Sequence, residues 1–275
     1  MSRRSRSRKL LALSGSALAV ILSAANALAA PGDITKKTGS GACVSADGSG
    51  GSCNLGKIAL KHARSTAISP DGKHLYVAFG EGLGIYDINQ TTGAITAKGG
   101  QAGCIAQGTF GECADGNRTT YLERLAISPD GKTLYGVTGY SGGDLVIFDR
   151  NLSTGVLTQS AQCFSWEGYG GCTNMTGYFY GPSDVAVSPD GTSVYVADPF
   201  TGMLIVFDRN SNGALTLKSG GSECFHQSGD GGCSIATMGM TPSRIAISPD
   251  GASLYLVDQF WGLSVFDRAG GGTLA

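Results

Sequence analysis

Four residues that could take part in chemistry occupy one position of an internal repeat, and each copy of the repeat carries its own side chain there. They stand two residues before an Ala-Ile-Ser-Pro or Ala-Val-Ser-Pro segment: Ser65, Arg124, Asp184 and Arg244. Guanidinium groups and a carboxylate that meet at one place suit an anionic or hydroxylated ligand, because both form charged hydrogen bonds. Opposite charges around a narrow channel also pair with one another, so a structural role is the alternative.

Two further sets of residues vary in the same way near this position. Arg64 and Glu123 stand one place earlier in their copies. The second apolar segment of each copy ends at Phe79, Thr138, Asp198 or Asp258, and aromatic residues such as Phe200, Phe260 and Trp261 follow. The predicted ligand-binding set is therefore Ser65, Arg124, Asp184, Asp198, Arg244, Asp258 and Trp261.

The repeat that places these residues is clearest in the turn Ser-Pro-Asp-Gly. Its four copies begin at intervals of 59, 60 and 60 residues, at Ser69, Ser128, Ser188 and Ser248. Apolar residues alternate with others beside each turn, and a period of two broken by turn residues is typical of antiparallel strands. Proline and aspartate favour the turn and glycine supplies positive φ, so each copy predicts a tight hairpin. The tyrosines of the second strands are expected to pack between copies: Tyr76, Tyr135, Tyr195 and Tyr255.

Each copy holds the residues for four short strands, which is one blade of a β-propeller. We expect an all-β fold, a β-propeller of four repeats of about 60 residues with four-stranded antiparallel blades, because radial stacking buries both faces of a twisted sheet. A single domain is expected over residues 30–275, with repeats at about 32–92, 93–154, 155–212 and 213–271. The segment near Ile34 has the pattern of an outer strand, so the two ends of the chain could complete one blade. A shortened relative of a larger ring, or two chains that form an eight-bladed ring, are the alternatives.

Eight cysteines fall in four local pairs, one for each repeat: Cys43/Cys53, Cys104/Cys113, Cys163/Cys172 and Cys224/Cys233. One pair per module in an exported protein indicates four disulfides within the modules. Zinc is the competing interpretation, but the cysteine spacing differs from paired Cys-x-x-Cys ligands, and no histidine recurs with the cysteines. Each bridge would stabilise its glycine-rich loop by about 2–3 kcal/mol.

Residues 1–29 have the pattern of a secretory signal peptide. Five basic residues, all within Arg3 to Lys9, precede an apolar run, and Ala27-Leu28-Ala29 fits the small-x-small cleavage rule. We therefore expect export by a bacterial cell, either to the cell envelope or as a secreted protein, with no membrane span after cleavage.

The charge of the chain after the leader limits the classes of partner. Without the five leader cations, 15 basic residues stand against 21 acidic ones, a net charge of about −6. Nucleic acid is not expected as a partner, because the sequence has no basic stripe. A small ligand, or an extracellular protein or glycan, is expected instead, bound by a monomer or a ring-completing homodimer.

No metal or cofactor is expected. The three histidines, His62, His74 and His226, do not recur as a ligand set. The sequence has no Gly-x-Ser-x-Gly nucleophile motif and no Asp-x-Asp-x-Asp-Gly calcium loop.

The recurring segments resemble the repeats of a known superfamily. Ser188 to Ala197 reads Ser-Pro-Asp-Gly-Thr-Ser-Val-Tyr-Val-Ala, and Ile205 to Thr216 contains Ile-Val-Phe-Asp-Arg and Asn-Gly-Ala-Leu-Thr. These motifs are similar to the YVTN-type repeats of the lactonase-like β-propeller superfamily, over essentially the whole chain after the leader. Its members typically have seven blades and include hydrolases of sugar lactones, lactonising cycloisomerases and exported repeat proteins with no known reaction. This sequence differs in its four repeats and in the cysteine loop of each.

The sequence predicts a secreted, disulfide-containing scaffold that binds a ligand or a protein. The alternative that the resemblance implies is a lactonase-like hydrolase of a sugar or acyl lactone. In such an enzyme Arg124 or Arg244 would hold the carbonyl or carboxylate, and Glu123, Asp184 or Asp198 would activate water. A cell-surface interaction module is the third class, with Trp166, Tyr169 and Trp261 as contacts.

Overall fold

Strands make up nearly all of the regular structure, as the period of two predicts. A computed structural model describes residues 37–45, 51, 53–55, 62–108, 111–139, 142–237, 239 and 241–275. Its regular elements are β-strands and short 3₁₀ helices, which confirms the all-β fold. The predicted signal peptide and the strand near Ile34 lie outside the described residues.

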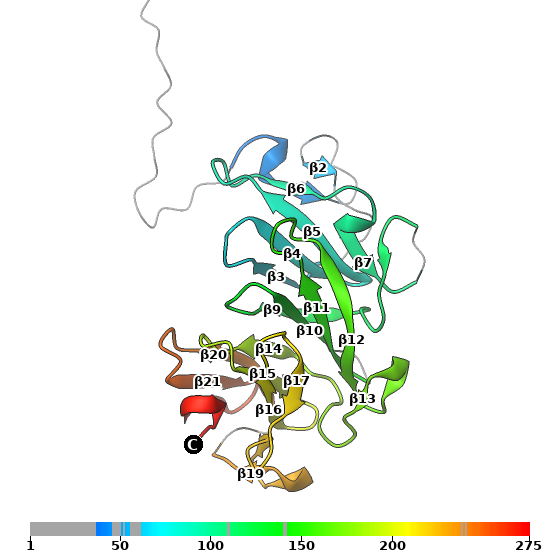
Figure 1. The fold of residues 1–275 in the computed structure, drawn as a ribbon. Coiled ribbons are helices and arrows are strands. Elements are labelled where there is room, and N and C mark those ends of the chain that lie inside the picture. Colours follow the sequence, from blue (N-terminus) through cyan, green and yellow to red (C-terminus); the bar gives the residue numbers. More distant parts are fainter. Residues whose placement is uncertain are drawn as a thin grey trace, which may run out of the picture. The chain divides into compact units, whose positions relative to one another are not determined.

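Four sheets follow one another along the chain, one for each Ser-Pro-Asp-Gly turn (Figure 1). The first sheet contains β3 (Ser65–Ile68), β4 (His74–Phe79), β5 (Gly82–Ile88), β6 (Ile95–Ala97), β7 (Cys104–Ala106) and β8 (Ala114–Asp115). The second sheet contains β9 (Leu122–Ile127), β10 (Thr133–Thr138), β11 (Asp144–Arg150), β12 (Leu157–Ser165) and β13 (Thr173–Asn174). The third sheet contains β14 (Asp184–Val187), β15 (Ser193–Asp198), β16 (Met203–Arg209), β17 (Leu215–Leu217), β18 (Cys224–His226) and β19 (Ser234–Ile235). The fourth sheet contains β20 (Pro242–Ile247), β21 (Ser253–Asp258) and β22 (Gly262–Asp267).

Smaller elements complete the described structure. A parallel pair precedes the first sheet and consists of β1 (Val44–Ser45) and β2 (Asn54–Leu55). The short 3₁₀ helices are η1 (Ser40–Ala42), η3 (Gly100–Gly103), η4 (Tyr169–Gly171), η5 (Asp230–Gly232) and η6 (Gly270–Gly272).

The strands of each sheet pair as an antiparallel meander, with one modification of the expected four-strand unit. In the second sheet β12 occupies the fourth position, whereas β6 with β7, and β17 with β18, share that position in the first and third sheets. A further short strand, β8, β13 or β19, pairs in parallel after the cysteine loop. Among the described residues no ladder joins the fourth sheet to the first, so the number of blades and the closure of a ring stay predictions.

The Ser-Pro-Asp-Gly turn forms the hairpin that the sequence predicts. In the third sheet the Ser188 hydroxyl donates to Asp190 at 2.6 Å and accepts from the Ser193 amide at 3.0 Å. Gly191 has a φ of 72°, a conformation that favours glycine. The turn therefore fixes the register of β14 against β15 with its own side chains.

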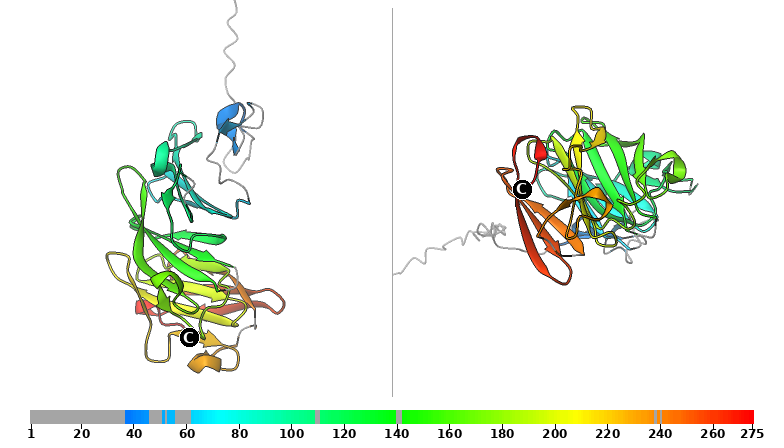
Figure 2. Two further views of the ribbon diagram at one scale, coloured as in Figure 1. Left: turned by 90° about the vertical axis from the view of Figure 1, so that its right-hand side faces the viewer. Right: turned by 90° about the horizontal axis from the view of Figure 1, so that it is seen from below.

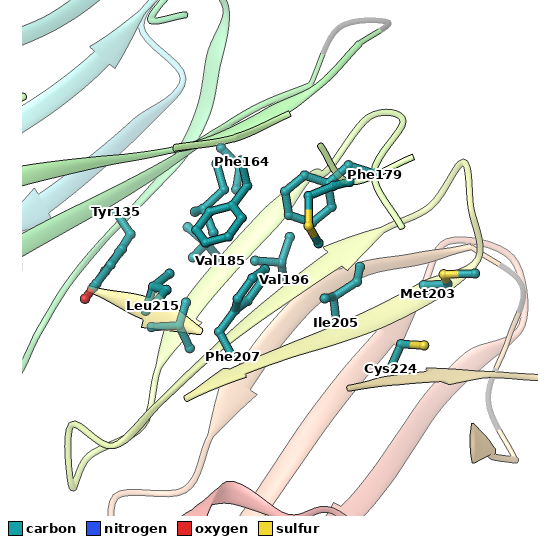
Figure 3. Close-up of a cluster of buried hydrophobic side chains, with 14 of the residues drawn as sticks. Tyr135, Phe164, Phe179, Val185, Val196, Met203, Ile205, Phe207, Leu215 and Cys224 are labelled. Atoms are coloured by element: carbon teal, nitrogen blue, oxygen red, sulfur yellow. The ribbon is translucent and has the colours of Figure 1, made fainter. Parts of the chain in front are cut away.

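Neighbouring sheets pack through apolar faces. Between the second and third sheets, Tyr135 and Phe164 face Val196, Ile205 and Phe207 (Figure 3). The rings of Phe164 and Phe207 have centroids 4.9 Å apart. A fully buried side chain of this size contributes about 1.5–3 kcal/mol, so the interface is a main source of stability. The fourth sheet, coloured orange to red in Figure 2, packs on the third in the same way.

A buried arginine joins each sheet to the sheet before it. Arg268, just after β22, donates from Nε to the Tyr195 hydroxyl at 2.8 Å and from Nη2 to both oxygens of Asp190 at 2.9 and 2.8 Å. The Tyr195 hydroxyl in turn donates to the carbonyl of Gly272 at 3.0 Å. We call such a set of arginine, tyrosine and aspartate an arginine latch.

The arginine latch occurs three times. Arg150 binds Tyr76 and Asp71 of the first sheet, and Arg209 binds Tyr135 and Asp130 of the second. The sequence predicted the tyrosines as packing residues, and the structure adds their hydrogen bonds. Burial raises the pKa of Tyr76 to about 12 against the opposing effect of Arg150, so its hydroxyl stays protonated and can donate. Hydrogen bonds from Ser69, the Lys73 amide and Arg150 hold the pKa of Asp71 well below its usual value.

Among the residues that the structure describes, a fourth arginine latch is not formed. Tyr255 is 37% exposed, whereas Tyr195 is fully buried, and no described arginine binds Asp250 or Tyr255. The first sheet has Ile88 at the position of the latch arginines. The joint between successive sheets therefore cannot be repeated in the same form between the fourth sheet and the first.

Residues that precede the first sheet in the chain form hydrogen bonds with the outer part of that sheet. Lys37 donates from Nζ to the carbonyl of Thr92, and Lys218 makes the corresponding contact with the carbonyl of Gly271. Asn54 adds a hydrogen bond from Nδ2 to the carbonyl of Ile95 at 3.3 Å. These contacts join the described residues before the first sheet to its outer side, whereas the predicted strand near Ile34 stays a prediction.

The four predicted disulfides are all formed: Cys43–Cys53, Cys104–Cys113, Cys163–Cys172 and Cys224–Cys233. Disulfides of this kind are typical of extracellular proteins. Among the described residues, no helix has the length and apolar character that a membrane span requires.

We expect Tyr195→Phe to lower the free energy of unfolding by about 1–3 kcal/mol, because Arg268 and the Gly272 carbonyl each lose a buried partner. Tyr255→Phe is the matched control, since it makes the same change at the same repeat position without a latch. Urea unfolding followed by circular dichroism measures both. An equal effect of the two substitutions would contradict the latch.

Candidate functional site

The first strands of the four sheets lie next to one another, in the order β3, β9, β14 and β20. The variable residues stand at the same register on these strands, so they form a row across the sheets. We call this row of Ser65, Arg124, Asp184 and Arg244 the inner-strand row. The four residues lie on neighbouring strands, and among them the side chains of Arg124 and Asp184 approach each other to 3.9 Å.

Acceptors and donors alternate along the inner-strand row. Ser65 Oγ accepts from the Leu125 amide of the next strand at 3.1 Å, and Asp184 Oδ2 accepts from the Ile245 amide at 2.7 Å. The two arginines reach back to the strand before them instead. Arg124 Nη1 donates to the Arg64 carbonyl at 3.2 Å, and Arg244 Nη1 donates to the Ser183 carbonyl at 3.3 Å.

Asp184 is the carboxylate at the centre of this row. It is 7% exposed, and its Oδ1 lies 3.9 Å from Nε of Arg124. Burial raises the pKa of Asp184, while the amides of Ile245 and Val185 and the charges of Arg244 and Arg124 oppose that rise. A carboxylate with a raised pKa beside two guanidinium groups can accept a proton and lies next to groups that bind negative charge.

Glu123 lies beside the row but is already paired. Its carboxylate forms an ion pair with Nη1 of Arg64, and both side chains are partly exposed. Of the three predicted proton acceptors, Glu123 is therefore the most accessible, whereas Asp184 is buried and Asp198 is fully buried.

Asp198 and Asp258 occupy a different place, at the ends of β15 and β21. Asp198 accepts four backbone hydrogen bonds, from Tyr180 and Gly181 through Oδ2 and from Phe200 and Thr201 through Oδ1, at 2.6–3.1 Å. Asp258 likewise accepts from the amides of its own hairpin and from Thr241. These contacts fix loops, and they leave Asp198 fully buried.

Some aromatic residues of the loops contact one another, and others are exposed. Trp166 and Tyr180 have ring centroids 5.0 Å apart, and Tyr180 and Phe200 are 5.8 Å apart. Trp261 is 75% exposed and lines a pocket of about 250 Å³ with Asp258.

A second pocket contains charged residues that the sequence analysis did not select. It has a volume of about 270 Å³, and its lining includes Arg118, Thr138 and Asp144. Arg118 donates to Oδ1 of Asp144 from Nε at 3.0 Å, and its Nη2 lies 3.0 Å from Oδ2. Asp144 stands where the other copies have Gly82, Met203 and Gly262, so a comparison of the repeats could have found it.

The described part of the chain offers no set of side chains that could bind a metal ion. No group of three or more His, Cys, Asp or Glu side chains there could hold a metal ion.

Comparison with known proteins finds similar folds. Crystal structures of candidate 6-phosphogluconolactonases from Bacteroides uniformis and Bacteroides fragilis each match with a TM-score of 0.55 and 20% identity, over 78% of this chain and 53% of theirs. A protein from Lactobacillus plantarum matches with the same values. The chain thus spans only about half the length of these proteins. No family model matches the sequence, and no curated protein matches it. At this identity the likeness shows the fold alone.

We expect Asp198→Asn to lower the free energy of unfolding by about 2–3 kcal/mol, because the amide nitrogen would face backbone donors that now share a carboxylate. Asp149→Asn is the control, since Asp149 is an exposed carboxylate on β11. Denaturant unfolding measures the difference. A stable Asp198→Asn protein would argue that the carboxylate is held for a ligand and not for the loop.

Proposed function

We propose that the protein is a hydrolase of sugar or acyl lactones, with the inner-strand row as its site. The observation that carries the proposal is the position of Asp184, buried and flanked by Arg124 on the strand before it and Arg244 on the strand after it. The folds of the candidate 6-phosphogluconolactonases support the same reaction class. Since this chain covers only about half of their length, the activity rests on the site and not on the likeness.

The reaction needs one base and one group that binds an oxyanion. Asp184 would accept a proton from water, whose oxygen attacks the lactone carbonyl carbon. Arg124 or Arg244 would stabilise the negative charge that develops on the carbonyl oxygen. When the ring C–O bond breaks, the leaving alkoxide takes the proton back from Asp184, and the product is a hydroxy acid. Glu123, which is paired with Arg64, would help to hold the substrate.

The fold also suits the second candidate function, a binding scaffold for an extracellular protein or glycan. The observation that favours it is the set of exposed aromatic side chains on the hairpins of the third and fourth sheets, Phe200, Phe260 and Trp261. Export, and a monomeric or homodimeric state, belong to both functions. Replacement of Phe260 by alanine would remove an exposed contact of the scaffold and leave lactone hydrolysis unchanged.

We expect the oxidised protein to hydrolyse at least one member of a panel of aldonolactones and acyl lactones, measured by acid release in a pH-stat. Asp184→Asn should reduce kcat by about 100-fold or more, the usual contribution of a general base. The Arg124→Ala/Arg244→Ala protein should lose activity as well. Asp149→Asn and Lys132→Ala, which change exposed charges outside the row, are the matched controls.

The pH dependence of hydrolysis should identify the base. A base acts when it is ionised, so kcat/KM should rise with pH through an apparent pKa above the usual carboxyl value of 3.8, because burial raises the pKa of Asp184. Asp184→Asn should abolish this rise. Absence of acid release above the uncatalysed rate across the panel, or full activity in folded Asp184→Asn, would exclude the proposal and leave the binding scaffold.

A further inference from the structure

A loop site recurs at the junctions between successive sheets. Among the described residues it has three copies, and they differ in whether side chains fill it or a pocket remains. The site is marked by the residue three places after the first cysteine in the second, third and fourth disulfides: Gln107, Trp166 and Gln227. Gln107 and Gln227 line the two pockets of about 270 and 250 Å³. At the middle junction Trp166 packs against Tyr180 instead.

The repeat shows what keeps the first junction open. Thr120 stands at the repeat position of Tyr180, four residues before the inner-strand row, and its hydroxyl donates to Oε1 of Gln107 at 3.0 Å. The same two positions are therefore in contact in both junctions. At the middle junction these positions hold the rings of Trp166 and Tyr180. At the first junction they hold the smaller amide of Gln107 and hydroxyl of Thr120, and a pocket remains.

The polar side chains that line the first pocket carry no net charge. The guanidinium of Arg118 forms a two-point contact with the carboxylate of Asp144, and Thr138 Oγ1 donates to the same carboxylate at 3.0 Å. Since this pair neutralises its own charges, an anionic ligand would have to displace Asp144 from Arg118. A neutral ligand with hydroxyl groups leaves this pair intact and can bond to the donor and acceptor sites that its guanidinium and carboxylate still offer.

The backbone of this pocket is held in an uncommon conformation. Arg118 and Tyr121 have φ values of 58° and 59°, in the left-handed region that side chains other than glycine rarely adopt. Such conformations cluster at ligand sites, where the surrounding structure maintains them. Here the two left-handed conformations direct Arg118 and Tyr121 to one pocket. At the repeat position of Asp144, the other copies carry uncharged residues.

We propose that the pocket formed by Gln107, Arg118, Thr120, Tyr121, Thr138 and Asp144 binds a neutral, polyhydroxylated ligand the size of one sugar unit. Amide, hydroxyl, guanidinium and carboxylate groups together can donate to and accept from several hydroxyls at once. The volume lies just below the roughly 300–1,000 Å³ of pockets for drug-sized ligands, which fits a single ring. The site shares no residue with the inner-strand row and does not depend on lactone hydrolysis.

Isothermal titration calorimetry of the full chain with glucose, galactose, mannose, N-acetylglucosamine and glycerol tests the proposal. The decisive variant is Gln107→Trp/Thr120→Tyr, which copies the filled middle junction into the first one. Gln227→Trp is the matched control, because it fills the pocket of the last junction with the same side chain. Circular dichroism establishes that each variant is folded.

Saturable binding of at least one sugar, weakened 10-fold or more by Gln107→Trp/Thr120→Tyr and unchanged by Gln227→Trp, is the expected result. Asp144→Asn should also weaken binding, since it removes an acceptor and frees Arg118. No binding of any sugar at millimolar concentration would overturn the proposal, and so would binding that Gln227→Trp alone abolishes or that both filled variants retain. Folded Asp184→Asn should bind the sugar normally, which separates this site from the proposed hydrolytic one.

Discussion

The structure depends on buried guanidinium groups. One sheet supplies each of these groups, and the preceding sheet supplies hydrogen-bond partners for it. The side chain of Arg150 is 1% exposed, and its hydrogen bonds go to Tyr76, Asp71 and its own Ser-Pro-Asp-Gly turn. A buried cation without such partners would cost several kcal/mol. The second, third and fourth sheets therefore need the sheet before them, both for their apolar faces and for their arginines. This coupling to the nearest neighbour is what gives a repeat protein a cooperative fold.

Residues that form the contacts between sheets are constrained by this coupling, whereas other positions of the repeat are free to vary. The turn aspartate, the second-strand tyrosine and the latch arginine are the same at all three internal joints, because each latch is made of these three side chains. The inner-strand row needs only a strand residue at its position, and its copies carry a hydroxyl, a carboxylate and two guanidinium groups. The loop sites after the cysteines are equally free, and they contain either stacked rings or polar groups. Candidate functional residues are therefore found at the repeat positions where neighbouring copies carry different side chains.

Local features could be predicted from the sequence, and features that join distant residues could not. The hairpins follow from four adjacent residues, and each disulfide closes a loop of nine or ten residues. The arginine latch joins residues 78 or 79 positions apart, and the turn alone already accounts for its aspartate, so no local pattern predicts that the recurring arginine binds it. Asp198 was selected because it is a charged residue at a variable position. Its four backbone donors come from two loops whose geometry no sequence pattern specifies.

The unformed latch bears on the proposal that two chains complete a ring. Such a dimer would place the fourth sheet of one chain against the first sheet of the other, and Asp250 and Tyr255 would then meet Ile88 where the internal joints have an arginine. Attraction would come from the exposed apolar side chains of that face, Val257, Leu263 and Val265. Burial of Asp250 without a cation would oppose it. A ring-completing joint of this kind would therefore be weaker than the three internal joints, and it would come apart before the sheets themselves unfold.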